Sequence, residues 1–323
     1  MRDILKNDPQ IEAWVRVVEA VKPDVLVIGD FDYDLNAVAL RALSKRLEGQ
    51  FYYFTRRPNR GFDSGRDLNG NGRLGEPADA EGYAEFAGQG GMGVLSRFPI
   101  LADDLNDFSA LDWWDLPETK YIDDGRSPRR LSTTVHWDLP VLLPSGEVLS
   151  LLIWHATAPV FDGPEDRNGR RNHDETQFWV RYVDALTESK PERPFLVMGT
   201  ANADAHDGES LPGAIRALLS HPGLQDTRPS SEGGREASLR DVGVNLFHQS
   251  PATLDTVDWP DDTGAPGNLR VDYVLPASGL DVEGSGVFWP ETGAALSAEA
   301  ALASRHRLVW VDINMNPADS RDD

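Results

Sequence analysis

The sequence predicts an α/β protein in which two mixed β-sheets pack against each other between flanking helices. Segments with helical and with strand-like patterns alternate along most of the chain. Several strand pairs lie too close in sequence for the helical crossover that joins parallel neighbours, which takes a dozen or more residues. The chain has 323 residues, of which 40% are hydrophobic, so it can bury a large core. Together these observations predict a two-sheet sandwich flanked by helices.

Apolar residues at three- and four-residue spacing predict the helices. Residues 11–21 show this spacing clearly, and Lys22-Pro23 ends the segment because proline cannot continue a helix. The predicted helices cover residues 11–21, 36–47, 174–186 and 213–219.

Short runs rich in β-branched residues predict the strands. Two of them flank the turn at residues 144–146 and form a strand pair. The predicted strands cover residues 24–28, 93–99, 131–143, 148–155, 195–199, 269–276 and 307–313.

The remaining sequence predicts long loops within one domain. Residues 56–91 are rich in Gly, Arg, Asp and Asn, residues 103–130 are irregular, and residues 226–268 are rich in loop signals. The sequence contains no internal repeat and no clear linker. We therefore expect residues 1–323 to form a single domain.

The composition restricts the partners. The net charge is −22, and only five of the 31 basic residues are lysine. Nucleic-acid binding over a broad surface requires a basic face, so this charge argues against duplex DNA as a partner. A local basic groove remains compatible with the sequence, because arginines cluster at Arg56, Arg57 and Arg60 and at two later places.

No apolar run approaches the roughly 20 residues that span a membrane, and the first ten residues have no signal-peptide core. We therefore expect no membrane partner. The compartment stays open: it is cytoplasmic by default, or extracellular if the native N-terminus was trimmed. The chain has no cysteine, which excludes disulfides and thiolate chemistry.

Polar residues follow the buried run at residues 195–199, which stops at a glycine and is followed by Thr200, Asn202 and Asp204. This stretch resembles the G-D-x-N motif of the endonuclease/exonuclease/phosphatase superfamily, to which DNase I belongs. Four further stretches resemble motifs of that superfamily and occur in its order: Gly91-Met-Gly-Val-Leu-Ser-Arg-Phe-Pro99, Ile153-Trp-His155 with Pro159, Leu269-Arg-Val-Asp272-Tyr273, and Ser304-Arg305-His306.

The resemblance implies a DNase I-like fold, a four-layer sandwich, and phosphoester hydrolysis assisted by Mg²⁺ or Mn²⁺. It implies that His306, oriented by Asp272, faces the scissile phosphate, and that Asn202 and His155 donate to phosphate oxygens. Each of these residues also has a structural interpretation, such as a turn cap for Asn202 or a hydrogen-bonded strand end for His155. The opening strand of the superfamily has no evident counterpart in this chain.

The chain departs from the superfamily at the expected metal site. The metal-binding glutamate falls at Asp30, the aspartate of G-D-x-N is Thr200, and the aspartate of the last motif is Arg305. Asp204 is a candidate replacement ligand. Two functions follow as alternatives: a phosphoester hydrolase with a weakened or rebuilt metal site, or an inactive member that binds a phosphate-bearing ligand or acts as a scaffold. The expected partner is a phosphate-bearing small molecule or nucleotide.

Two other segments are candidate binding regions. Residues 161–175 follow the His155 strand, so Arg170, Arg171 and His173 are candidate substrate contacts, with a charged surface loop as the alternative. Arg305 is a further candidate, because a guanidinium binds phosphate through two hydrogen bonds.

A possible calcium loop begins at Asp67. The side chains of Asp67, Asn69 and Asn71 stand at positions 1, 3 and 5 of an EF-hand-like pattern, and Gly72 stands at position 6. Position 12 carries Ala78 instead of the expected acid. We therefore keep both a structural Ca²⁺ site and a glycine-rich turn as interpretations.

Overall fold

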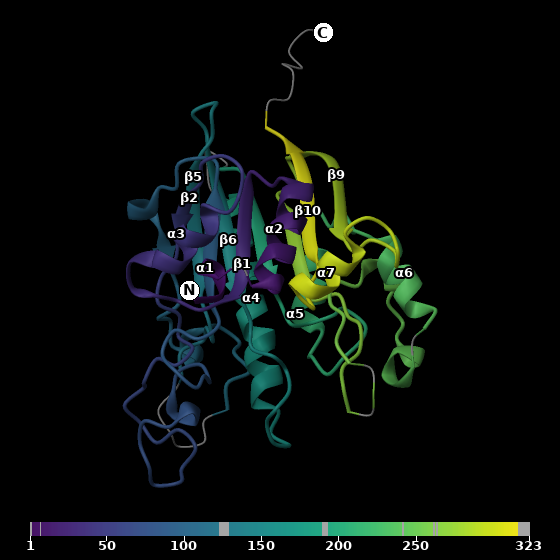
Figure 1. Ribbon diagram of the computed structural model, residues 1–323. Helices are drawn as coiled ribbons and strands as arrows, with labels where there is room; N and C mark the ends of the chain where they lie inside the picture. Colours follow the sequence, from purple (N-terminus) through teal and green to yellow (C-terminus); the bar gives the residue numbers. More distant parts are fainter. Residues whose placement is uncertain are drawn as a thin grey trace.

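The computed structural model describes residues 2–6, 8–122, 129–188, 193–240, 242–260, 262 and 264–315. Ten strands and seven α-helices of these residues form four layers, with β-sheets inside and helices outside (Figure 1). This arrangement confirms the predicted α/β class with mixed sheets flanked by helices.

The first sheet has five strands in the order β4-β5-β6-β7-β8. Its strands are β4 (Asn106–Asp107), β5 (His136–Leu142), β6 (Val148–His155), β7 (Phe195–Thr200) and β8 (Asp272–Pro276). The β6–β7 pair is parallel and the other pairs are antiparallel, so the sheet is mixed. The neighbouring strands β6, β7 and β8 carry the candidate site residues.

The second sheet layer consists of two separate pieces. Three strands pair in the order β1-β3-β2, and β9 pairs with β10. These strands are β1 (Val25–Phe31), β2 (Tyr52–Phe54), β3 (Gly91–Ser96), β9 (Asp281–Phe288) and β10 (Leu308–Asn314). The two predicted sheets are therefore three hydrogen-bonded units arranged in two layers.

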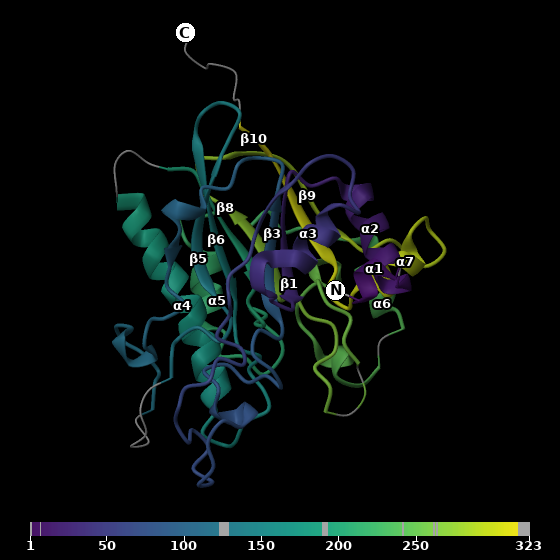
Figure 2. The same cartoon turned by 60° about the vertical axis from the view of Figure 1, so that its left-hand side comes forward.

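Helices cover both outer faces (Figure 2). The α-helices are α1 (Arg2–Leu5), α2 (Pro9–Val21), α3 (Val38–Ser44), α4 (Arg167–Glu188), α5 (Gly213–Leu219), α6 (Glu232–Ser238) and α7 (Ser297–Ala303). Short 3-10 helices occur at Leu35–Ala37, Pro77–Asp79, Ala102–Asp104, Trp113–Asp115, Gly243–Phe247 and Ala252–Leu254. Local sequence sets the ends of α2: the Asp8 side chain accepts the Gln10 N–H, and Lys22 ends the helix in a left-handed conformation.

Two hydrophobic cores lie on opposite faces of the five-stranded sheet. On the outer face, Trp154 of β6 and Val197 of β7 pack with Trp179 of α4 and residues of α5. On the inner face, Leu151 and Ile153 of β6 pack with residues of β2 and β3. Because both faces of β6 are buried, its sequence is a nearly continuous apolar run.

The structure differs from the sequence prediction in several elements. The helix predicted for residues 174–186 begins at Arg167, so residues expected in a surface loop form its first turns. The strands β2, β4 and β9 and the helices α1, α6 and α7 were not predicted. In β9, Gly284 and Gly286 interrupt the alternation that normally reveals a strand, and the Trp310 ring packs over both positions.

A groove of about 690 Å³ separates β1 from β10. The edges of these two strands line its sides, apolar residues of α2 lie against it, and residues of β7 and β8 line it from the five-stranded sheet. One edge of β1 and one of β10 have no partner strand among the residues described. The groove reaches the ends of the strands that carry the candidate site.

None of the described helices combines the length and the apolar character that crossing a bilayer requires.

The inner core predicts a large effect of truncation at Leu151, whose side chain is fully buried between the two sheet layers. We expect Leu151→Ala to lower the free energy of unfolding by about 2–5 kcal/mol, because it leaves a cavity in a packed core. Urea denaturation measures this loss. The control Leu74→Ala removes a side chain that is 68% exposed and is expected to change stability little. Equal effects of the two variants would contradict the layered packing.

Candidate functional site

The candidate site lies where three neighbouring strands carry polar residues in one register row. His155 ends β6 and pairs with Thr200 at the end of β7, which in turn pairs with Asp272 at the start of β8. Side chains in one register row project from the same face of a sheet at neighbouring positions. Gly199 permits the close approach of β7 to β6, because a Cβ there would lie 2.0 Å from the carbonyl oxygen of Trp154.

The carboxylate of Asp272 is the centre of the hydrogen bonding in the row. Its Oδ1 accepts from Thr200 Oγ1 at 2.6 Å, and its Oδ2 accepts from Thr256 Oγ1 at 3.0 Å. His306, which precedes β10, forms a third hydrogen bond to this carboxylate, with a distance of 2.8 Å between its Nδ1 and Asp272 Oδ2. Thr256 Oγ1 also accepts the backbone N–H groups of Val271 and Asp272. Both oxygens of Asp272 are therefore occupied.

Mutual contact favours the charged forms of Asp272 and His306. Burial alone raises the pKa of Asp272, but the charge of His306 and the hydrogen bonds to the carboxylate outweigh it, so the pKa is lowered. Burial alone lowers the pKa of His306, but the charge and hydrogen bond of Asp272 outweigh it, so the pKa is raised. The pair combines a carboxylate with an imidazolium over a wider pH range than isolated groups would.

His155 has the opposite electrostatic character. It is buried, with 6% of its surface exposed, and burial lowers its pKa more than the charge of Asp30 raises it. Its Nδ1 is buried and has no hydrogen-bond partner among the described residues. Gly29 lies beside this nitrogen, since a Cβ there would come within 3.6 Å of it. The surroundings of the two histidines therefore shift their pKa values in opposite directions.

Asp30, the expected metal ligand, forms an ion pair. Arg60 Nη1 lies 2.8 Å from Asp30 Oδ1, with the two side chains 25% and 58% exposed. Arg60 comes from the long loop that follows β2, and its guanidinium fills the space beside Gly90. The electrostatic influence of Asp30 and Arg60 on the pKa of His155 shows that the pair lies near the histidine.

Asn202 lies next to the row, but its amide is used within the fold. The residue has a left-handed backbone with φ of 49°, which asparagine tolerates. Its Nδ2 donates to the carbonyl of Ala156 at 2.8 Å. The expected donation of this group to a phosphate therefore competes with a hydrogen bond that joins the ends of β6 and β7.

The residues at this site do not fit the divalent cation that the resemblance implies. A hard cation requires several oxygen ligands. Both Asp272 oxygens accept hydrogen bonds, Thr200 is uncharged, and Asp30 is paired with a guanidinium. Across the described part of the chain, no group of three or more His, Cys, Asp or Glu is placed to hold a metal ion.

Two other predicted site residues have structural roles in the interior. Asp204 is 2% exposed, and its Oδ1 accepts the backbone N–H groups of His206 and Asp207 as well as the Ser250 hydroxyl. Arg171 is 4% exposed and donates to the carbonyls of three consecutive residues, 130–132. The structure therefore corrects the expectation that Arg171 lies on an accessible substrate lip. Asp204 Oδ2 accepts the backbone N–H of Arg270, so both oxygens of Asp204 accept hydrogen bonds.

The remaining residues of the predicted lip belong to the first turns of α4. Arg170 Nε donates to the carbonyl of Glu165, and His173 Nδ1 lies 2.9 Å from Asp174 Oδ1. Neither residue lines the groove that His155, Thr200, Asp272 and His306 line. The structure does not bring Arg170 and His173 to the register row.

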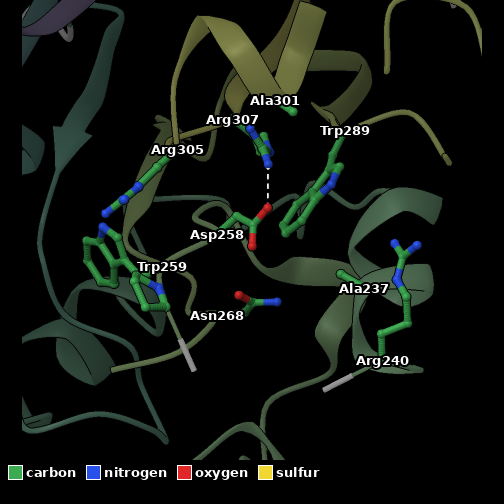
Figure 3. Close-up of a pocket in the computed structure, with 10 residues that line it drawn as sticks. Ala237, Arg240, Asp258, Trp259, Asn268, Trp289, Ala301, Arg305 and Arg307 are labelled. Carbon is green, nitrogen blue, oxygen red and sulfur yellow. Dashed lines mark hydrogen bonds and ion pairs between the residues drawn. The ribbon is translucent and has the colours of Figure 1, made fainter. Parts of the chain in front are cut away.

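Arg305 lies in a pocket next to the site (Figure 3). Trp259, Trp289, Arg240, Arg305 and Arg307 line this cavity of about 500 Å³, which we call the arginine–tryptophan pocket. Arg305 was expected beside the metal position; in the structure its side chain lines this pocket together with Trp259 (Figure 3).

The segment of the predicted calcium loop closes on its own hydrogen bonds. The Asp67 carboxylate accepts the N–H groups of Gly70, Asn71 and Gly72. The Nδ2 groups of Asn69 and Asn71 both donate to Glu76 Oε2. The polar side chains thus form one exposed cluster.

Sequence reasoning missed three residues of the site region: Arg60, Thr256 and Trp259. The arginine cluster around Arg60 was a signal for a basic groove, but its pairing with Asp30 joins residues 30 positions apart. Thr256 and Trp259 fall in a loop-rich stretch without a recognisable motif.

Solved structures with the same fold support this architecture. An endonuclease/exonuclease/phosphatase family protein from Leptotrichia buccalis is 16% identical, with a TM-score of 0.50 over 94% of this chain and 92% of that chain. An endonuclease/exonuclease/phosphatase from Beutenbergia cavernae is 18% identical, with a TM-score of 0.52 over 95% of this chain and 66% of that one. The human Nocturnin catalytic domain with bound sulfate is 12% identical, with a TM-score of 0.52 over 95% and 87%. At these identities the likeness shows the fold alone.

No curated protein sequence matches the chain. The sequence profile of the Endonuclease/Exonuclease/phosphatase family, however, matches residues 2–306. This match includes His155, Thr200 and Asp272 of the register row, and it also includes His306. The chain therefore belongs to the endonuclease/exonuclease/phosphatase family, whose members are phosphoesterases and nucleases.

Proposed function

We propose that this chain binds a phosphate-bearing small molecule or nucleotide at the His155–His306 site, and that the divalent-metal-dependent hydrolysis typical of the family is weakened there. One observation carries the proposal: Thr200 takes the place of a carboxylate in the row and donates a hydrogen bond to Asp272. Thr200 thus supplies no carboxylate for a cation, and its hydroxyl occupies one oxygen of the neighbouring Asp272 carboxylate.

The proposed binding rests on groups that attract an anion. The imidazolium of His306 is held by Asp272 through Nδ1, so its other ring nitrogen is available as a charged donor. Arg60 adds a second positive charge near His155. The human Nocturnin catalytic domain, which shares the fold, holds a sulfate anion, and this supports an oxyanion as the ligand class here.

The overall charge favours a small ligand over duplex DNA. The net charge of −22 repels a long polyanion, whereas a single phosphoester meets only the local charges of the site. Between the bound phosphate and the protein we expect charge-assisted hydrogen bonds, which are about twice as strong as neutral ones.

Hydrolysis with a rebuilt metal site is the second candidate function. The observation that favours it is the exposure of Asp30, whose side chain is 58% accessible although it is paired with Arg60. A cation from solution, Mg²⁺ or Mn²⁺, would have to displace that guanidinium and recruit ligands beyond the row.

Restoring the carboxylate at position 200 tests the proposal. We expect the wild-type protein to show no EDTA-sensitive turnover of a chromogenic phosphodiester. We expect Thr200→Asp to gain Mg²⁺-dependent turnover, by about a hundredfold over background, because it returns a carboxylate to the row. Thr200→Asn is the matched control, since it has a similar shape without the charge. EDTA-sensitive turnover by the wild type at the rate of Thr200→Asp would overturn the weakened-site proposal and support the rebuilt site.

The raised pKa of His306 predicts pH-dependent binding. The imidazolium is present below that pKa and is lost as pH rises through it, so affinity for an anion falls with rising pH. Dimethyl phosphate is the suitable probe, because its single charge does not change between about pH 6 and about pH 9. Titration of the His306 ring proton by NMR, with and without this probe, measures the effect.

Variants assign this pH dependence to one histidine. We expect His306→Gln to weaken binding of dimethyl phosphate about tenfold at low pH and to remove the pH dependence. His206→Gln, which removes an exposed histidine, should leave the affinity for dimethyl phosphate and its pH dependence unchanged. An affinity that stays constant across the pH range in the wild type would contradict the assigned role of His306.

We also propose that the Asp67 loop binds a structural Ca²⁺ ion. The support is the spacing of Asp67, Asn69 and Asn71, together with the contacts of both asparagine side chains with the Glu76 carboxylate. Calcium at about 100 times its dissociation constant would stabilise the fold by about 2.7 kcal/mol. We expect Ca²⁺ to raise the Tm of the wild type and not that of Asp67→Asn, with Asp103→Asn as the control. An equal Tm with Ca²⁺ and with EDTA in the wild type would favour the glycine-rich turn.

A further inference from the structure

The arginine–tryptophan pocket shares a wall with the His155–His306 site. The segment around Thr256 to Asp258 pairs with the segment around His306, through bonds from Asp258 N to Arg305 O and from Arg307 N to Thr256 O. Along extended chain, successive side chains point to opposite sides. His306 accordingly contacts Asp272, while Arg305 and Arg307 line the pocket on the other side (Figure 3).

The distance between the two sites is short. The ring of Trp259 lines the pocket and meets the ring of His306 edge to face, with centroids 5.5 Å apart and an interplanar angle of 81°. The pocket volume of about 500 Å³ lies within the range of small-molecule sites, about 300–1,000 Å³. Trp259 is therefore a contact that the pocket and the His306 side of the wall share.

The charges of the pocket favour an anion. Three arginines line it against the single carboxylate of Asp258, in a chain whose net charge is −22. Arg307 is buried, pairs with Asp258 at 2.6 Å and lies over the Trp289 ring. Arg240 lies 3.5 Å from Glu236 and contacts Thr292. The exposed guanidinium of Arg305 has no side-chain partner among the residues described, so its donors are available.

The pocket also offers surfaces for a planar group. Trp259 and Trp289 contribute indole rings, and the Asn268 side chain points into the space between them (Figure 3). Asn268 is 5% exposed, which places a polar amide in a largely enclosed position. Indole faces stack on the rings of bases and of sugars, and the amide can donate and accept.

We propose that the arginine–tryptophan pocket binds a second phosphate group of the ligand, with Arg305 as the residue that recognises it. This inference rests on the proposed binding of a first phosphate at His306. The natural ligand is then a small molecule with two phosphates, rather than a simple monoester. A guanidinium offers two parallel donors to phosphate, so Arg305 is a specificity-determining residue and not a catalytic one.

Calorimetric titration of the full chain tests this inference. The probes are adenosine 3′,5′-bisphosphate, ribose 1,5-bisphosphate and adenosine 5′-monophosphate. We expect the bisphosphates to bind about tenfold to a hundredfold more tightly than the monophosphate. Arg305→Gln should remove this advantage, whereas the exposed control Arg41→Gln should keep it. Because the Arg305 side chain is exposed, its replacement should leave the circular dichroism spectrum unchanged.

Each outcome decides a different point. Tighter binding of the adenosine compound than of the ribose compound would support the inference and assign its ring to the tryptophans, and equal binding would support recognition of the phosphate alone. Equal affinity of the wild type for mono- and bisphosphates would overturn the inference and leave the proposed function standing, provided that His306→Gln weakens monophosphate binding. If no probe binds the wild type, the proposed function fails and the inference fails with it.

Discussion

The carboxylate of Asp272 is the contact on which the arrangement of the site depends. It joins β8 to β7 through Thr200, to the preceding segment through Thr256, and to the start of β10 through His306. These elements belong to both sheet layers, so one buried charge fixes their relative position. A buried carboxylate is stable only when its oxygens are satisfied, and here three side chains satisfy it. The same contacts that orient His306 also remove Asp272 from the ligands open to a cation.

The sequence was sufficient for the strands that are buried on both faces. β6 and β7 are apolar runs bounded by turn residues, and they occur close to the predicted positions. The first turns of α4 were missed because charged residues such as Arg171 bury their side chains there by donating to backbone carbonyls. The strand β9 was missed because its glycines make room for Trp310, a contact that no local pattern encodes.

The sequence predicted the positions of the candidate residues that stand at strand ends, and it did not predict the partners that a long loop supplies. The register of β6, β7 and β8 brings His155, Thr200 and Asp272 together in one row. The Arg60–Asp30 ion pair depends on how a loop folds back. Successive side chains of the extended segment around Arg305 point to opposite sides. The motif does not define where this segment starts, so the sequence did not predict the side to which Arg305 points.

The open strand edges along the groove also affect how molecules of this protein meet each other. Backbone groups on one edge of β1 and of β10 have no partner strand among the described residues, and such edges can pair with a strand of a second molecule. Asp312 places an exposed charge on β10, and the net charge of −22 makes identical copies repel one another. Salt screens this repulsion. The excess of acidic residues therefore opposes pairing of two copies through these edges, and this repulsion weakens as the ionic strength rises.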